Sequence, residues 1–274
     1  MASFAGAVAA SHGPLLIREW DAVPPAEKER LKGAFDELGR RLRAAKPDVL
    51  IVVSPDHWSN FFLDNYPAAC IGVGAAHDGP PEPWMKGFSH GQLSGDPGFA
   101  MHIAEEAMRA GFEPSVSHRL KLDHGACIPL WRMGLEKLPR IVPLLVNAIE
   151  PPMPSLERCL GWGGLLRRAI ESYRAPLRVA IVATGGLSHS IGEPTMGAIH
   201  EDFDRETLRC FSSSDESLIP YLEKELPRRG NGSEEVRNWL VAHGAALGRG
   251  FELVDYLPVP TVLVGCGFAA WKVE

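Results

Sequence analysis

The sequence contains no apolar run near the roughly 18 residues that a membrane span requires, so no membrane partner is expected. Its five cysteines include no Cys-x-x-Cys pair, which disfavours a disulfide framework or cysteine zinc knuckle and indicates a reducing cytoplasm. Basic residues are not in excess: the formal net charge is -6, which disfavours a nucleic-acid partner. The apolar N-terminus lacks a basic segment, so residues 1–12 are interpreted as a strand rather than a signal peptide.

What is present is an ordinary globular composition, with 45% hydrophobic and 23% charged residues in 274, enough for a substantial core. Short β-branched runs predict strands at 49–53, 141–146, 177–183 and 261–265, and the proline in the second favours an edge or a bend. Hydrophobic periodicity predicts helices at 24–45, 97–111, 160–173, 197–210, 214–226 and 233–247. This alternation predicts one three-layer α/β domain over residues 1–274.

The segment 75–95 differs from the rest because it is rich in glycine and proline and also carries His77, Trp84 and His90. We expect a long surface loop here, and long loops often act as binding lids.

Four histidines have unusual local contexts: His12 in SHGP, His57 in PDHW, His124 in DHG and His189 in GGLSH. His12 and His57 follow apolar runs. Because α/β proteins place functional side chains at strand ends, the two are candidate metal ligands on neighbouring strand ends. For either histidine taken alone, a turn histidine bonded to backbone is the favoured interpretation. Their wide separation also matches no HxxxH motif.

Two glutamates, Glu234 and Glu235, lie in the first turn of the predicted helix 233–247, where acidic residues need no function. Glu235 shares a helical face with Trp239 and Ala242, so we expect it to point inward. A buried carboxylate must be paired or must bind a cation. Two imidazoles and one carboxylate make the triad of non-haem Fe(II) oxygenases. Glu234 and Asp123 are the alternative carboxylates.

The remaining motifs each allow a structural and a functional interpretation. Asp123, beside His124, fits a simple turn, and Gly185-Gly186 indicates close backbone approach to a ligand or to another strand. Ser188 beside His189 suggests a hydrolase nucleophile, although the GxSxG elbow is missing. A structural role, without chemistry, is expected for His77, His90, His102, His118, His200 and His243.

Taken in order, these motifs resemble the type III extradiol ring-cleavage dioxygenases, of the type of the protocatechuate 4,5-dioxygenase catalytic β subunit and the dihydroxyphenylpropionate dioxygenases. The resemblance is carried by residues 11–14, 54–57, 61–64, 70–72, 123–125, 184–189 and 235–239, which span nearly the whole chain. It implies a central mixed, mostly parallel sheet flanked by helices. It also implies that His12, His57 and Glu235 hold Fe(II), and that His189 and His124 are the acid/base catalysts.

The activity implied by the resemblance is extradiol (meta) cleavage of a catecholic compound, in particular an aromatic acid, by O2 to a ring-opened semialdehyde. A homo-oligomer is also expected. The protocatechuate enzyme covers its site with a small separate subunit, so here either such a partner or the segment 75–95 is the lid. The alternatives are a zinc-dependent hydrolase, a DOPA-type dioxygenase on the same scaffold, and a non-catalytic binding relative.

Overall fold

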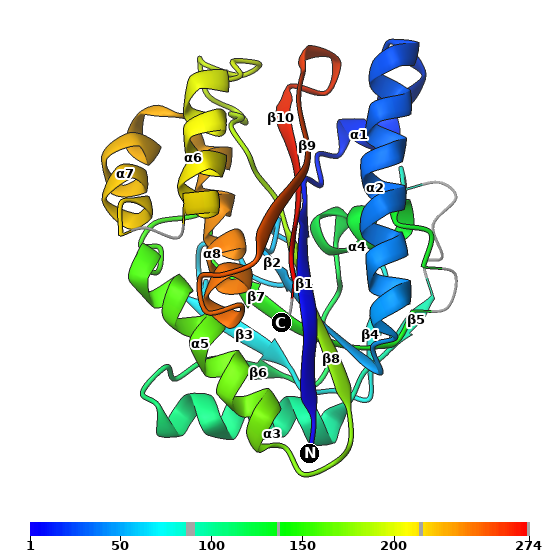
Figure 1. Ribbon diagram of the computed structural model, residues 1–274, viewed down its shortest axis with the longest axis vertical. Coiled ribbons are helices and arrows are strands. Elements are labelled where there is room, and N and C mark those ends of the chain that lie inside the picture. The colour runs from blue at the N-terminus through cyan, green and yellow to red at the C-terminus, as the bar shows by residue number, and fades with distance from the viewer. Residues whose placement is uncertain (86–90, 136–137, 214–215, 273–274) are drawn as a thin grey trace.

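The computed structural model describes residues 1–85, 91–135, 138–213 and 216–272. In Figure 1 the central sheet is seen edge-on, with α2 and α4 on its right and α5, α6, α7 and α8 on its left. The three-layer α/β architecture expected from the alternation of strands and helices is therefore confirmed. None of the helices within the described ranges is long and apolar enough to cross a bilayer.

Among the described residues, eight strands form the central sheet in the order β6-β3-β7-β2-β8-β1-β10-β9. Strands β7, β2, β8 and β1 run parallel to one another, whereas β10 and β9 continue the sheet antiparallel at one edge. At the other edge β3 is antiparallel to β7 and parallel to β6. The strands are β1 (Ser3–Ala10), β2 (Val49–Ser54), β3 (Ala69–Gly72), β6 (Ser115–Ser117), β7 (Arg140–Val146), β8 (Arg178–Thr184), β9 (Phe251–Val259) and β10 (Val264–Trp271). The sheet is mixed and mostly parallel, as the resemblance implies.

Each face of the sheet carries its own apolar core. One core is covered by α1 (Leu15–Arg18), α2 (Pro25–Ala45) and α4 (His124–Arg132). The other is covered by α3 (Pro97–Arg109), α5 (Leu156–Ser172), α6 (Glu201–Ser213), α7 (Leu218–Glu225) and α8 (Val236–Ala245). The apolar face of α2 is the predicted one, since Leu31, Phe35, Leu38 and Leu42 are all buried. Because both faces are covered, the inner strands are apolar on both sides.

Several element boundaries differ from the prediction because caps and turns were missed. The predicted helix 160–173 begins at Leu156, where the Ser155 side chain accepts a hydrogen bond from the Arg158 N–H at 3.1 Å. The predicted helix 197–210 is α6, Glu201–Ser213, and the predicted helix 214–226 is α7, Leu218–Glu225, with residues 214–215 outside the described ranges.

Two further predictions need correction. The strand predicted at 141–146 is confirmed as β7, but it is not an edge strand, because β7 lies between β2 and β3. Pro143 is tolerated there because the pairing with β3 begins only at Leu144, so the missing N–H interrupts no bond to β3. The predicted strand 261–265 instead contains a 3-10 turn, Pro260–Val262, and Leu263 at φ 58°, which together connect β9 to β10.

The predicted helix 233–247 begins later than expected. Residues Asn231–Glu235 form a 3-10 turn, and α8 starts at Val236 with Glu235 at its N-cap position. Ser233 does not cap this helix, because its hydroxyl donates to the carbonyl of Arg229. This offset decides where the Glu235 side chain points.

The segment 75–95 is only partly a loop. Its ends form two short strands, β4 (Ala76–Asp78) and β5 (Gln92–Ser94), which pair antiparallel as a small second sheet. Residues 86–90, including His90, lie outside the described residues.

Candidate active site

Three parallel strands bring three histidines together at the carboxyl ends of the strands. His12 follows β1, His57 follows β2, and His189 follows β8. The strand order is β2-β8-β1, and the carboxyl ends of parallel strands meet at the same edge, so the three side chains converge. His12 and His57 therefore come from strands separated by β8, not from adjacent strands as predicted.

The Glu235 carboxylate enters this cluster from the start of α8. Its Oε1 lies 3.2 Å from His12 Nε2 and 3.3 Å from His57 Nε2. Its Oε2 accepts a hydrogen bond from the Gly186 N–H at 2.8 Å and lies 3.9 Å from His189 Nε2. With Glu235 only 1% exposed, this carboxylate is the shared partner of all three imidazoles.

The paired glycines after β8 allow this contact. Gly185 has φ 107°, and a Cβ there would lie 2.6 Å from Glu235 Oε2. Two side chains of α8 also bind the same turn: Trp239 Nε1–H donates to the Gly185 carbonyl and the Asn238 amide donates to the Thr184 carbonyl. The close approach predicted for Gly185-Gly186 is therefore an approach to the carboxylate of Glu235.

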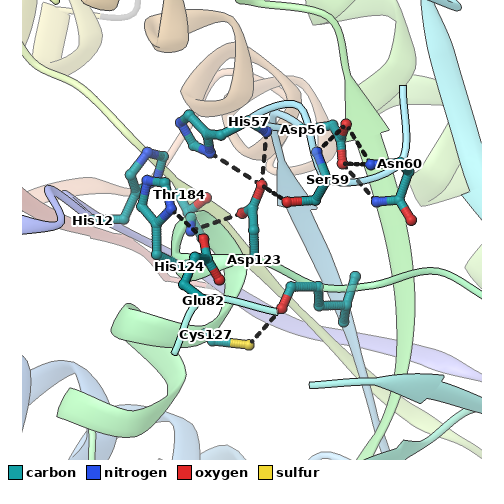
Figure 2. Close-up of polar contacts among 12 residues, drawn as sticks. His12, Asp56, His57, Ser59, Asn60, Glu82, Asp123, His124, Cys127 and Thr184 are labelled. Carbon is teal, nitrogen blue, oxygen red and sulfur yellow. Dashed lines mark hydrogen bonds and ion pairs between the residues drawn. The ribbon is translucent and has the colours of Figure 1, made fainter. Parts of the chain in front are cut away.

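His57 is held by a second carboxylate, Asp123. The backbone N–H of His57 donates to Asp123 Oδ2 at 2.7 Å, and His57 Nδ1 lies 3.3 Å from the same oxygen (Figure 2). Asp123 Oδ1 accepts the N–H of Gly125, so the predicted turn is the N-cap of α4. Burial by itself would lower the pKa of His57, but Asp123 and then Glu235 raise it to about 10. Asp123 thus fixes the backbone N–H and ring Nδ1 of His57, on the side of the ring away from Glu235.

The turn that presents His57 is shaped by Asp56. This buried carboxylate accepts the backbone N–H groups of Ser59 and Asn60, and the Asn60 amide donates to it as well (Figure 2). It also accepts the backbone N–H of Phe61. The aspartate of the PDHW motif is thereby explained as a turn-forming residue.

His124 joins the cluster from the N-terminus of α4. Its ring centroid lies 4.2 Å from that of His57 and 5.8 Å from that of His12. Glu82 Oε1 lies 2.7 Å from His124 Nδ1 and accepts the His124 backbone N–H at 3.0 Å. Because Nδ1 donates to Glu82, Nε2 is the nitrogen available to a ligand. No sequence motif marks Glu82 as a site residue, and its only signal is membership of the segment 75–95.

His189 is oriented by backbone alone. Its Nδ1 lies 3.0 Å from the Leu187 carbonyl, to which it donates, so Nε2 faces Glu235. The ring also lies against Gly232, where a Cβ would come within 2.2 Å of Nε2. The neighbouring Ser188 hydroxyl donates to Asp204 Oδ2 at 2.7 Å. Ser188 is therefore paired with Asp204 rather than His189, which argues against the serine-hydrolase interpretation.

Glu234, the other alternative carboxylate, is directed elsewhere. It forms an ion pair with Arg237, whose guanidinium also donates to the Pro154 carbonyl. Glu234 therefore has a structural role at the start of α8, while Glu235 faces the histidines.

A cavity of about 200 Å³ adjoins the five predicted site residues. A cavity of roughly 150 Å³ accommodates benzene, so one aromatic ring fits here. Besides the cluster His12, His57, His124, His189 and Glu235, the wall is formed by Gly13, Pro14, Leu15, Arg18, Ser190, Ile191, Met196, Val262, Leu263 and Val264. Most of these wall side chains are apolar, which favours an apolar ligand body.

The donor set fits a divalent cation. Burial by itself would raise the pKa of Glu235, but His12, His189 and His57 hold it well below its ordinary value. A buried ionised carboxylate requires a cation or charged partner. Burial lowers the pKa of His12 against the pull of Glu235, which favours the neutral imidazole that binds metals. Two imidazoles and one carboxylate match ferrous oxygenase and catalytic zinc sites alike.

Two other donor groupings share His124. His12, His57 and His124 offer nitrogens within 4.8 Å of one another, as do donor atoms of Glu82, Asp123 and His124. In the second grouping Asp123 is already bound to His57 and Gly125, and Glu82 is bound to His124. Glu235, the predicted third ligand, belongs to neither grouping, but its Oε1 lies within 3.3 Å of the Nε2 atoms of His12 and His57.

Comparison with known proteins agrees with this geometry. The family described as the catalytic LigB subunit of aromatic ring-opening dioxygenase matches residues 6–264. The chain belongs to this family. The type III extradiol resemblance drawn from the ordered motifs is thereby confirmed.

Several curated relatives of this LigB-family chain share the name 2,3-dihydroxyphenylpropionate/2,3-dihydroxicinnamic acid 1,2-dioxygenase. That of Cupriavidus necator is 32% identical over 194 residues, 70% of this chain and 58% of the relative. That of Escherichia coli is 31% identical over 192 residues, 68% of this chain and 57% of the relative. The match thus spans little more than half the length of these relatives. The crystal structure of an uncharacterized Escherichia coli K12 protein shares the fold, with a TM-score of 0.65, 16% identity and coverage of 96% and 98% of the two chains.

Proposed function

We propose that this chain catalyses the extradiol cleavage of a catecholic aromatic acid by O2, using Fe(II). The observation that carries the proposal is the convergence of two imidazoles and Glu235 beside an apolar cavity that fits one aromatic ring. Membership of the LigB family and the printed names of the relatives support the same reaction class.

In this proposal His12, His57 and Glu235 hold the metal. This donor set of two imidazoles and one carboxylate leaves coordination positions open. Binding of the cation would displace the proton that Asp123 and Glu235 favour on His57. Bound Fe(II) supplies a shared site for the catechol oxygens and O2 and the redox chemistry that joins them. Asp123 and the Gly186 N–H fix the orientations of His57 and Glu235, which lowers the cost of assembling the site.

Two histidines outside the ligand set move protons. His189 donates through Nδ1 to a carbonyl, so its Nε2 accepts a proton from a substrate hydroxyl. His124 donates through Nδ1 to Glu82, so its Nε2 delivers a proton during ring opening. Glu82 fixes the orientation of the His124 ring, and the apolar cavity wall excludes water from both histidines.

The segment 75–95 is the lid in this proposal. Glu82 and Trp84 both come from it, and the Trp84 ring centroid lies 5.7 Å from that of His124. This contact favours coverage from within the chain over a separate small subunit. We also propose a homo-oligomer and a cytoplasmic location, the latter supported by five free cysteines that are all buried.

Anaerobic reconstitution with Fe(II), followed by a panel of catechols, tests the function. We expect stoichiometric O2 uptake and a yellow ring-opened product with at least one carboxylated catechol, without added protein partners. The Zn(II)-loaded protein is the matched control and should consume no O2. Full iron occupancy without O2 uptake for every catechol would overturn the proposal.

A further inference from the structure

Arg18 stands out in the wall of the site cavity because it is the one arginine or lysine among the described residues that line it. It is the last residue of α1 and is exposed. Its guanidinium forms no hydrogen bond or ion pair with any residue in the described ranges. By contrast, Arg132 donates to the Leu16 carbonyl and lies 3.8 Å from the Trp20 ring centroid. Arg18 is thus left with its full hydrogen-bonding capacity at the cavity.

The backbone of Arg18 is fixed relative to the candidate metal ligands. Its N–H donates to the Pro14 carbonyl at 3.2 Å, and the Leu16 N–H donates to the Gly13 carbonyl at 3.0 Å. Gly13 directly follows His12, so one short turn connects the ligand to the arginine. The backbone of Arg18 is therefore held in a fixed position close to His12 in the chain.

The rest of the described cavity wall offers no free counter-charge to Arg18. Ile191 and Met196 line the cavity with 50% and 56% of their surfaces exposed, which places two apolar side chains near its mouth. Glu235 is the one carboxylate in the described lining, and it is engaged with His12 and His57. An apolar ring with one anionic substituent matches this distribution.

We propose that Arg18 is the residue that determines specificity for the acid, by binding the carboxylate of the substrate while the ring occupies the apolar cavity. This inference rests on the proposed function. Arginine suits the role because its planar guanidinium forms two parallel hydrogen bonds with a carboxylate, which lysine does not. This contact strengthens the binding of catechols that carry an anionic side chain and does not change the binding of neutral catechols.

The test compares 2,3-dihydroxyphenylpropionate with its uncharged methyl ester. Arg18→Gln should raise the KM for the acid roughly 10- to 100-fold, because loss of a hydrogen-bonded charge pair weakens binding by a factor of that size. The kcat for the acid, and both kcat and KM for the ester, should stay unchanged. Arg18→Lys should fall between Arg18→Gln and the unsubstituted protein. Arg168→Gln, at an exposed position of α5 away from the cavity, is the matched control and should leave the KM and kcat for both substrates unchanged.

Anaerobic calorimetry of the same two compounds provides a readout that does not need turnover. The acid should bind more weakly to Arg18→Gln by the same factor, and the ester equally well to both proteins. Unchanged acid binding, or equal losses for acid and ester, would overturn the role of Arg18. Absence of O2 uptake with every catechol would overturn the proposed function instead, while the binding comparison would still decide the role of Arg18.

Discussion

Glu82 binds His124 twice through a single oxygen: Oε1 lies 2.7 Å from the ring Nδ1 and accepts the backbone N–H at 3.0 Å. The second oxygen, Oε2, is buried without a hydrogen-bond partner among the described residues. The contact therefore orients an imidazole at the site and connects the segment 75–95 to α4.

Removal of this contact should slow turnover without loss of metal. Glu82→Ala leaves His124 Nδ1 and its backbone N–H unpaired, and we expect kcat to fall about 10-fold, which corresponds to one hydrogen bond of about 1.4 kcal/mol. Glu82→Gln keeps an acceptor oxygen and should recover most of the rate. Steady-state O2 uptake and iron content measure the two effects. Loss of iron in Glu82→Ala would show that the residue belongs to the metal site instead.

Ligand and proton-transfer variants should separate cleanly. His12→Ala and Glu235→Ala each remove one of three proposed ligands, and we expect Fe(II) affinity to fall by more than roughly 100-fold, since even outer hydrogen-bond partners contribute 10- to 100-fold. His189→Ala should retain iron and lose rate. Metal analysis after anaerobic reconstitution measures occupancy, and retention of iron by both ligand variants would refute the assignment.

Gly232 should be intolerant of any side chain. A Cβ there would lie 2.2 Å from Nε2 and 2.3 Å from Cδ2 of His189, so Gly232→Ala must displace this ring. We expect kcat to fall on the order of 100-fold with iron occupancy unchanged, because small misplacements of catalytic groups are costly.

The matched control is Gly33→Ala on the exposed face of α2, where nothing lies within 4 Å of the new Cβ. It should raise the free energy of unfolding by about 0.5–1 kcal/mol and leave turnover unchanged. Equal turnover in both variants would remove His189 from the proposed mechanism.

His243 should make the fold sensitive to acid. Burial lowers the pKa of this imidazole to about 4, whereas the unfolded chain titrates near 6.5. Between these two values the unfolded state binds more protons than the folded state. The contribution of neutral His243 to the free energy of unfolding is therefore fully present above about pH 6.5. It is lost as the pH drops toward 4, by about 3 kcal/mol in total.

Urea unfolding at pH 7 and pH 4.5 measures this loss. His243→Gln, whose amide oxygen can still accept the Trp271 indole N–H, should lose less stability between the two pH values. His118→Gln, at an exposed position, should behave like the unsubstituted protein. An unchanged pH dependence in His243→Gln would exclude His243 as the cause.

Predictions from sequence were most accurate where local chemistry decides the structure. The apolar face of α2 and the runs that became β2 and β8 carry periodicities that indicate burial directly. The sequence-based predictions were least accurate at turns and helix caps, such as those at Ser155 and Ser233 and the connection through Leu263. There one side-chain hydrogen bond or one residue with positive φ shifts a boundary.

The sequence by itself determined that His12, His57 and His189 follow strands, and that Glu235 lies near the start of a helix on the face that turns inward. Those features depend on neighbours along the chain. Only the tertiary structure decided that these residues meet, because convergence depends on strand order and direction.

The tertiary structure also supplied Glu82, Gly232 and Arg18, whose importance comes from contacts with residues distant in sequence or from a shared cavity wall. No local pattern distinguishes a glutamate bound to an imidazole from one on a solvated surface. Packing alone brings such groups together and fixes the distances on which their chemistry depends.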